Sequence, residues 1–298
     1  MNVLKNHRVV VVILFLMFSL ESHACDVCSC GSSNSSSFGS AIPGNYIGIL
    51  YNYMKFHYNE GVFENSPIAK DHINTLTISG QYQVNDAIQV NILLPYRFNH
   101  RYTSVDNVHN NGLGDITLFG TYELFSKKEE HSLKLGAGLK LPTGNFDLLS
   151  SQSNKTSATQ LGTGSLDFMI PIQYGYSYED LSLSLGAVYF MKNKNKEEFK
   201  YGNQTQINAS VSYSFQLKKG IGLSPMLGVS YDNFLATERF DLVDSRTSGY
   251  MTTASLGLEV SIKKLVFGLN SKLPIKQNLI ENEVRFKSGV GLYAYRKF

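Results

Sequence analysis

The 298-residue chain has no tryptophan, and its three cysteines all lie between positions 25 and 30, so all cysteine chemistry is confined to that segment. After residue 20, no apolar run is long enough to cross a bilayer as a helix. The formal net charge is only +3, which indicates neither a nucleic acid nor an acidic partner. Tyrosine and phenylalanine are plentiful instead, with 18 of each, as in the aromatic girdles of membrane barrels.

The first 24 residues are typical of a secretory signal peptide. Lys5 and Arg8 form a basic start, residues 9–20 form an apolar run too short for a transmembrane helix, and Ser22-His23-Ala24 is a small-x-small cleavage pattern. We therefore expect three parts: a signal peptide (1–24), a Cys-containing flexible periplasmic segment (25–43) and a single outer-membrane barrel domain (44–298).

Beyond residue 43, stretches of about ten residues alternate apolar side chains with polar or small ones. The segment 206–215 shows this most clearly. One face carries Ile207, Ala209, Val211, Tyr213 and Phe215, and the other carries Gln206, Asn208, Ser210, Ser212 and Ser214. A period of two places the two sets on opposite sides of a β-strand. With no helix for a sheet to pack on, the pattern predicts an all-β fold, a transmembrane antiparallel β-barrel that is closed because lipid cannot satisfy an open edge.

The alternation predicts twelve strands, at 44–58, 70–84, 87–101, 112–125, 131–141, 164–177, 181–192, 203–216, 221–232, 250–262, 265–274 and 283–298. Short polar turns alternate with longer loops, which is the asymmetry between periplasmic turns and extracellular loops. Both termini are therefore expected in the periplasm. The closing strand ends in Phe298, which resembles the signal read by the outer-membrane assembly machinery. These features predict a monomer embedded in the outer-membrane lipid of a Gram-negative bacterium.

Three glycine-containing passages in the middle of the chain carry a family resemblance. Gly112-Leu113-Gly114-Asp115 opens one strand, residues 138–144 (Gly-Leu-Lys-Leu-Pro-Thr-Gly) close another, and Leu161-Gly162-Thr163-Gly164-Ser165 opens the next. In this order and spacing they resemble the outer-membrane barrels grouped as transporters of the phenol-degradation (MetA-pathway) type. The resemblance implies a 12-strand barrel with a transport role.

The N-terminal cysteines suggest a second type of chemistry. Cys25, Cys28 and Cys30 have a C-x-x-C-x-C spacing that lets thiolates converge on a soft metal such as Cu(I) or Zn(II), with Asp26 or an external group completing the site. The alternatives are a local disulfide formed in the oxidising periplasm and lipidation of Cys25. Either alternative would leave the segment without a metal role. No His follows Cys28, so the haem-attachment pattern is absent.

Charged and amide side chains at alternate positions are expected to face the lumen. These pore-lining candidates are Asp115, Glu123, Lys134, Lys140, Asp167, Gln173, Glu259, Lys272, Arg285 and Lys287. One interpretation is a mixed-charge pore wall that selects polar or amphipathic solutes. The other is a narrow lumen closed by salt bridges that only hold the barrel in shape. The set predicts a polar interior, which suits a conduit better than an apolar ligand pocket.

No catalytic pattern accompanies the barrel pattern. The sequence contains no G-x-S-x-G elbow, no zinc-protease helix motif and no phosphate-binding glycine loop. The histidines of the mature chain, His57, His72, His100, His109 and His131, are expected near strand ends or in loops, and no serine pairs with them as in a lipid hydrolase. We therefore predict a non-enzymatic, porin-like passive channel for a small solute, with no catalytic residue and no nucleic-acid partner. The alternative is a closed structural or surface-binding barrel.

Overall fold

The computed structural model describes residues 44–60, 67–127, 130–147, 159–218 and 220–298. Fourteen strand segments form one antiparallel sheet, in which β4–β5 and β10–β11 are each a single strand with an interruption. The segments are β1 (Tyr46–Asn59), β2 (Ile68–Gln83), β3 (Ile88–Tyr102), β4 (Asn107–Leu113), β5 (Ile116–Lys127), β6 (His131–Leu141), β7 (Asp167–Tyr178), β8 (Leu181–Met191), β10 (Gln204–Tyr213), β11 (Phe215–Lys218), β12 (Ile221–Phe234), β15 (Gly249–Ile262), β16 (Leu265–Leu279) and β17 (Val284–Lys297).

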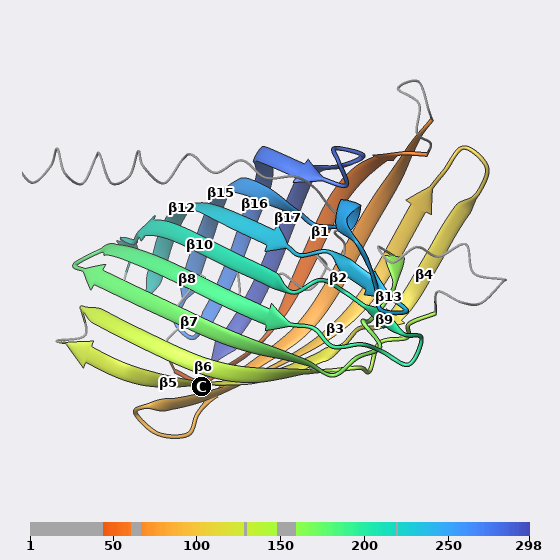
Figure 1. Cartoon of the computed structure of the whole chain (residues 1–298). Coiled ribbons are helices and arrows are strands. Elements are labelled where there is room, and N and C mark those ends of the chain that lie inside the picture. Colours follow the sequence, from red (N-terminus) through yellow and green to blue (C-terminus); the bar gives the residue numbers. More distant parts are fainter. Residues whose placement is uncertain (1–43, 61–66, 128–129, 148–158, 219) are drawn as a thin grey trace, which may run out of the picture.

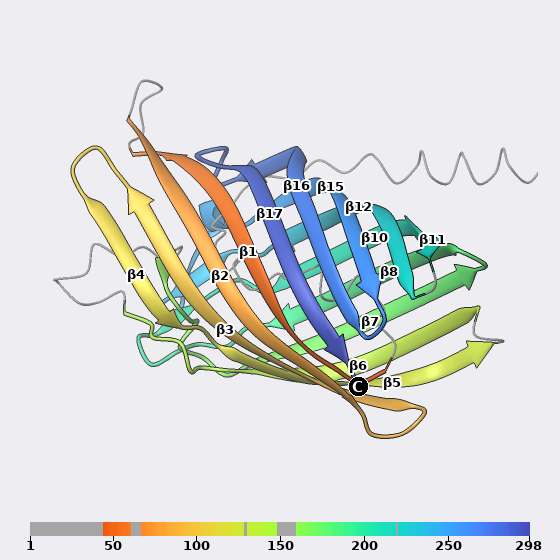
Figure 2. The ribbon, with the colours of Figure 1, turned by 180° about the vertical axis from the view of Figure 1, so that it is seen from behind.

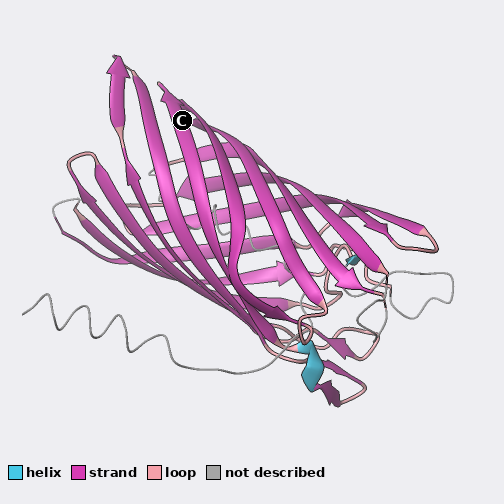
Figure 3. Ribbon diagram, turned by 90° about the horizontal axis from the view of Figure 1, so that it is seen from above, coloured by secondary structure: helices cyan, strands magenta, loops and turns pink. Residues whose placement is uncertain are grey.

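The sheet closes where the first strand meets the last. β1 pairs with β2 on one side and with β17 on the other, and Tyr46 lies opposite Lys297 in the second pairing. The predicted closed barrel of twelve strands is therefore confirmed. Figures 1 and 2 show its two walls, and Figure 3 shows that strands dominate the fold. No helix with the length and hydropathy of a membrane span occurs in the described part of the chain.

The connections differ at the two ends of the barrel. At the end that carries Tyr46 and Lys297, here called the terminal end, tight turns join the strands, and Glu179 (φ 50°) and Lys263 (φ 54°) adopt the positive φ that two-residue hairpins require. The opposite end, here called the loop end, carries the longer connections. It also carries a small sheet of β9 (Phe199–Lys200), β13 (Thr237–Arg239) and β14 (Leu242–Asp244), and a 3₁₀ turn, η3 (Ser245–Thr247), which the alternation pattern did not predict.

An apolar belt surrounds the outside of the barrel. On β3, the outward positions from Ile88 to Phe98 are all apolar or aromatic, and Ile92 and Tyr96 are each 38% exposed. Ten residues of strand extend about 33 Å along the strand axis. With a strand tilt of about 45°, this length corresponds to a height of roughly 24 Å along the membrane normal. This height matches the apolar band of about 25 Å in outer-membrane barrels. The outer face therefore fits the hydrocarbon layer of a membrane.

Candidate functional site: the barrel interior

A buried ionic cluster lies inside the barrel towards the loop end. The Nζ atom of Lys140, on β6, lies 2.9 Å from Oδ2 of Asp115 and 3.7 Å from Oδ2 of Asp167. The three side chains are 5%, 1% and 1% exposed, respectively. The structure thus brings together three of the residues that the alternation placed in the lumen.

The same cluster joins the three family-like passages. The backbone N–H groups of Gly144 and Thr163 donate to the Asp115 carboxylate, at 3.0 and 2.7 Å. The Thr163 hydroxyl donates to Asp167 at 2.9 Å. A Cβ atom at Gly162 would lie 2.2 Å from Oδ1 of Asp115, so a residue larger than glycine would displace the carboxylate. The cluster therefore fixes both ends of the β6–β7 connection to the barrel wall.

The second part of the β6–β7 connection folds into the barrel. Thr159 and Gln160 are each only 2% exposed. The Arg97 guanidinium donates to the Gln160 carbonyl at 3.2 Å, and the Asn110 amide donates to the Thr159 carbonyl at 2.8 Å. Because Arg97 and Asn110 are inward-facing residues of β3 and β4, this segment narrows the lumen at the loop end.

A second ion pair lies nearby on β2 and β3. Arg101 makes a bidentate contact with Asp71, at 2.8 and 2.9 Å. Its guanidinium lies 4.2 Å from the centre of the Tyr58 ring, whose hydroxyl donates to Asp71 at 3.2 Å. The two ion pairs therefore bring charges of both signs to this end of the interior.

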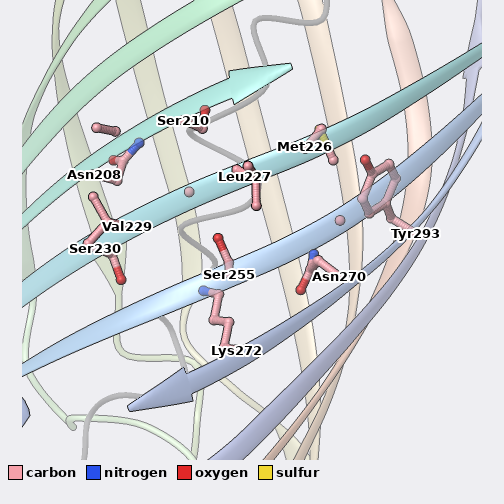
Figure 4. A pocket seen from close by; sticks show the side chains of 13 residues that line it. Asn208, Ser210, Met226, Leu227, Val229, Ser230, Ser255, Asn270, Lys272 and Tyr293 are labelled. Atoms are coloured by element: carbon pink, nitrogen blue, oxygen red, sulfur yellow. The ribbon is translucent and has the colours of Figure 1, made fainter. Parts of the chain in front are cut away.

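A pocket of about 80 Å³ lies against the opposite wall. Side chains from β10, β12, β15, β16 and β17 line it (Figure 4). Met226 and Tyr293 supply an apolar and an aromatic surface, while Asn270, Lys272 and Ser255 supply polar groups. Ser255 and Lys272 are opposite each other in the β15–β16 register, and the Tyr293 hydroxyl donates to Glu259 at 2.8 Å. The pocket therefore combines apolar and aromatic side chains with hydrogen-bonding groups.

The interior is less polar than the sequence suggested. One buried apolar cluster comes from inward positions near the loop end of β1, β2, β12 and β15–β17. It comprises Phe56, Ile73, Phe234, Met251, Leu279, Val284 and Phe286. A second cluster near the terminal end contains Tyr46, Leu50, Val266, Tyr293 and Tyr295. The sequence predicted a polar interior, and these two clusters show that the interior is apolar in part. Aromatic and aliphatic side chains occupy inward positions of β1, β2, β12 and β15–β17, where they pack on one another.

The other pore-lining candidates lie at separate places. Lys134 donates to the side-chain oxygen of Gln89 at 3.0 Å, and its cross-strand partners are Glu123 on β5 and Gln173 on β7. Glu259 lies beside Tyr293 in the pocket wall described above. The candidates therefore form a loop-end cluster, a terminal-end group on β5–β7 and a pocket on the far wall rather than one ring.

Two of the candidates point the other way. Arg285 and Lys287 are exposed and alternate with the buried Val284 and Phe286, so both lie on the outer face. The cause is a β-bulge: Lys55 of β1 pairs with Ser288, but the next residue, Phe56, pairs with Phe286, so that Lys287 is skipped. An extra residue reverses the inward and outward alternation of a strand. The assignment of Arg285 and Lys287 to the lumen was therefore wrong.

Several inward polar residues were not among the candidates. They include Asp71, Arg97 and Arg101 on β2 and β3, and Asp232 on β12, to which Gln206 donates at 2.8 Å. The alternation of 206–215 already placed Gln206 and Asn208 on the polar face, so strand parity could have found them. The hydrogen bond from Arg97 to the Gln160 carbonyl has no such signal in the sequence, because it joins positions 63 residues apart.

The cysteine proposals concern residues outside the described part of the chain, as do the signal peptide and the flexible segment. Among the described residues, no group of three or more His, Cys, Asp or Glu side chains is arranged to hold a metal ion. His100 and His109 do lie together, with their Nδ1 atoms 2.6 Å apart on β3 and β4.

Known proteins share this architecture. A crystal structure of an outer-membrane channel from Pseudomonas putida F1 superposes with a TM-score of 0.64 and 15% identity, covering 88% of this chain and 98% of that one. The translocator domain of the autotransporter NalP from Neisseria meningitidis gives 0.52 and 12%, covering 89% and 92%. The β domain of the Bordetella autotransporter BrkA gives 0.51 and 9%, covering 86% and 100%. A search of curated proteins found no match.

The sequence itself matches a family model. The match covers residues 70–264, from β2 to the turn after β15, and the family is described as "Putative MetA-pathway of phenol degradation". This range includes all three glycine-containing passages and the ionic cluster that they form. A closed barrel of this height with an apolar outer belt is the fold of bacterial outer-membrane proteins. The chain belongs to this family, and its fold is that of the β-barrels of bacterial outer membranes.

Proposed function

We propose that the protein is a passive channel for small amphipathic solutes of the phenol class, molecules with one ring and one or two polar groups. The observation that carries the proposal is the mixed lining of the barrel. Apolar clusters and hydrogen-bonding side chains share the interior, and charges of both signs are interleaved. Because no single sign dominates, the wall does not favour a cation or an anion. The family description, which names phenol degradation, and the likeness to the outer-membrane channel from Pseudomonas putida F1 support the same proposal.

The pocket on the β10–β17 wall is the proposed contact point for the solute. A ring stacks favourably on an aromatic side chain, and a hydroxyl group prefers a hydrogen-bond partner to an apolar surface. Tyr293 and Met226 would contact the ring, while Asn270 and Lys272 would bind the hydroxyl. The loop-end cluster and the inward-folded segment would restrict the size of what enters.

We propose further that the terminal end faces the periplasm and the loop end faces outward. Outer-membrane barrels have short periplasmic turns and long extracellular loops, and the connections here have that asymmetry. Passage is passive, and the barrel acts as a monomer inserted through its C-terminal strand, with Phe298 read by the assembly machinery. A soft-metal role for Cys25, Cys28 and Cys30 stays a prediction from the sequence.

Single-channel recording in planar bilayers tests the proposal. The mature protein should give open current steps in salt, and added phenol should interrupt them reversibly, while glucose at the same concentration should not. Tyr293→Leu removes the ring from the pocket and should weaken the block by phenol severalfold. Tyr231→Leu is the matched control, because Tyr231 lies on the outer face of β12 with 39% of its surface exposed. It should leave the block unchanged.

A folded barrel that never opens would support the alternative, a structural or surface-binding role. Open steps that phenol does not interrupt would leave a channel but remove its solute class. Equal effects of the two tyrosine substitutions would show that the pocket is not the contact point.

A further inference from the structure

Basic side chains gather on one side of the outer surface. On β1, β2 and β17, outward positions near the loop end hold Lys55, His57, Lys70, His72, Arg285 and Lys287, here called the basic band; Asn59 and Ile68 are the outward residues beyond it. Lys70, Arg285 and Lys287 are exposed, and the other three are half-buried.

The strand register places these side chains next to one another. His57 lies opposite Arg285 on β17 and opposite Lys70 on β2, while Lys55 lies opposite His72. The His57 ring is also within electrostatic reach of Lys287. Neighbouring strands are about 4.8 Å apart, so Arg285 and Lys70 lie roughly 10 Å apart on either side of His57. An anion above His57 would therefore have cations on both sides.

The basic band begins where the apolar belt ends. On β1, the outward residues Ile47, Ile49, Tyr51 and Tyr53 precede Lys55. On β2, Leu76 and Ile78 lie below His72 and Lys70. Since the belt is roughly 24 Å high on the neighbouring strand, the cations lie at the level of the lipid headgroups.

The basic band is confined to one side of the barrel. In the part of the chain that the structure describes, the outward loop-end positions of β7, β8 and β12 hold aromatic residues such as Phe168, Tyr189 and Tyr231 instead. Among the described residues, no ion pair involves Lys55, Lys70 or Lys287. Nearby carboxylates point elsewhere: Asp71 faces inward to Arg101, and Glu60 and Glu283 lie in the connections beyond.

We propose that the basic band binds the phosphate groups of lipopolysaccharide in the outer leaflet. The inference rests on the proposed outward orientation of the loop end. Clusters of Lys and Arg at the edge of an apolar span bind anionic headgroups, each cation strengthening binding about fivefold. The band offers four such cations around two histidines, at headgroup height and on one side only. One patch of this size fits one phosphorylated glycolipid headgroup beside β17, β1 and β2.

Titration of the purified, folded barrel with lipid A, followed by native mass spectrometry, tests the proposal. The variant replaces Lys55, Lys70 and Lys287 with Gln, and its lipid A affinity should fall on the order of 100-fold. The control replaces Lys263, Lys264 and Arg296 with Gln, since all three are exposed at the terminal end. A third variant with Arg at positions 55, 70 and 287 should bind as the wild type does, which separates lost charge from lost folding.

The same titration with phosphatidylglycerol tests the choice of lipid. Its binding should be weak and should change little in the variant. Equal loss of both lipids would overturn the assignment to lipopolysaccharide, and unchanged lipid A affinity would overturn the basic band as a site. Loss of lipid A binding in the control alone would place lipopolysaccharide at the terminal end and refute the orientation. Conductance and its block by phenol, measured on the same variants, should stay at the wild-type level. These recordings therefore test the channel proposal independently of the lipid-binding proposal.

Discussion

Replacing Lys140 with Met should destabilise the barrel and loosen its inward-folded segment. Removing one partner of a buried ion pair costs about 3–5 kcal/mol, because it leaves an uncompensated charge. Asp115 and Asp167 are each 1% exposed, so neither could be solvated by water in place. Backbone donors from Gly144 and Thr163 would remain on Asp115. We therefore expect the lower end of that range, about 3 kcal/mol.

The effect is measurable in two assays. Urea unfolding of the refolded barrel, followed by the gel shift between folded and unfolded forms, gives the free energy of unfolding. Single-channel recording should show larger or noisier steps, because the segment after Thr143 loses its fixed ends. Lys134→Met is the matched control on the same strand, since Lys134 is half-buried and bonded to the neutral Gln89. It should cost about 1.5 kcal/mol, the lower end of the range for a hydrogen bond that involves a charged group, because Lys134 is only half-buried.

Two outcomes would contradict this reasoning. Lys140→Met and Lys134→Met could prove equally stable, which would show that the cluster does not depend on its lysine. Alternatively, the double variant Lys140→Met with Asp167→Asn could be no more stable than Lys140→Met alone, although the Oδ2 atom of Asp167 faces a hydroxyl that can accept a hydrogen bond from an amide. We expect it to recover part of the loss, because one of the two uncompensated carboxylates is then neutral.

Three further predictions concern the outer face and the loop end. Leu256→Arg, at the middle of the outer face of β15 where the side chain is 60% exposed, should cost about 2–4 kcal/mol in unfolding experiments in bilayers, whereas Leu242→Arg on β14 should have little effect. The hydrogen bond from Lys194 holds the pKa of Asp241 below its usual value. At any pH above 3.8, the ordinary pKa of aspartate, this pair therefore contributes its full stabilisation to the loop-end sheet. The stabilisation is lost as the pH falls through the lower pKa that Asp241 has in the folded protein. Proteolysis of the loops should therefore be constant from neutral pH to about 4 and should increase only below it. Gly202→Ala should weaken the same region, seen as faster proteolysis at neutral pH, because the new methyl group would lie 1.7 Å from a backbone oxygen of the β12–β13 connection.

The strands were the predictable part of this molecule. A period of two is a local signal, and it located β6, predicted and observed at 131–141, and β8, observed to end one residue earlier than the predicted 192. The signal fails where one residue is inserted. The bulge at Lys287 reversed the faces of Arg285 and Lys287, and β16 continues past Pro274 to Leu279 through another irregularity in its pairing with β15. Nothing in the local composition marks the bulge at Lys287, whereas the irregularity in β16 adjoins Pro274, a residue that strands accommodate at bulges.

The interior was predictable in its members but not in its contacts. The alternation placed Asp115, Lys140 and Asp167 inside, and the strand register brings them together, because Lys140 lies opposite Asp167 on one side and opposite Thr117 on the other. The alternation does not predict the return of the β6–β7 connection to the wall. That return is held by long-range hydrogen bonds from Arg97 and Asn110, which no period in the sequence encodes. The loop-end sheet of β9, β13 and β14 likewise depends on a long-range contact, because Lys200 of β9 lies opposite Glu238 of β13, 38 residues further along the chain.

The sequence features that identify the family and the side chains proposed to select a solute lie in different parts of the barrel. The glycine-containing passages converge on Asp115, Lys140 and Asp167, where their backbone N–H groups and hydroxyls are already bonded within the protein. Groups that are satisfied in this way have little capacity left for a passing molecule. The pocket with Tyr293 lies on the other wall and is built from none of these passages. Membership of the family therefore indicates how the inward segment is anchored, and the solute must be read from the β10–β17 wall of this particular chain.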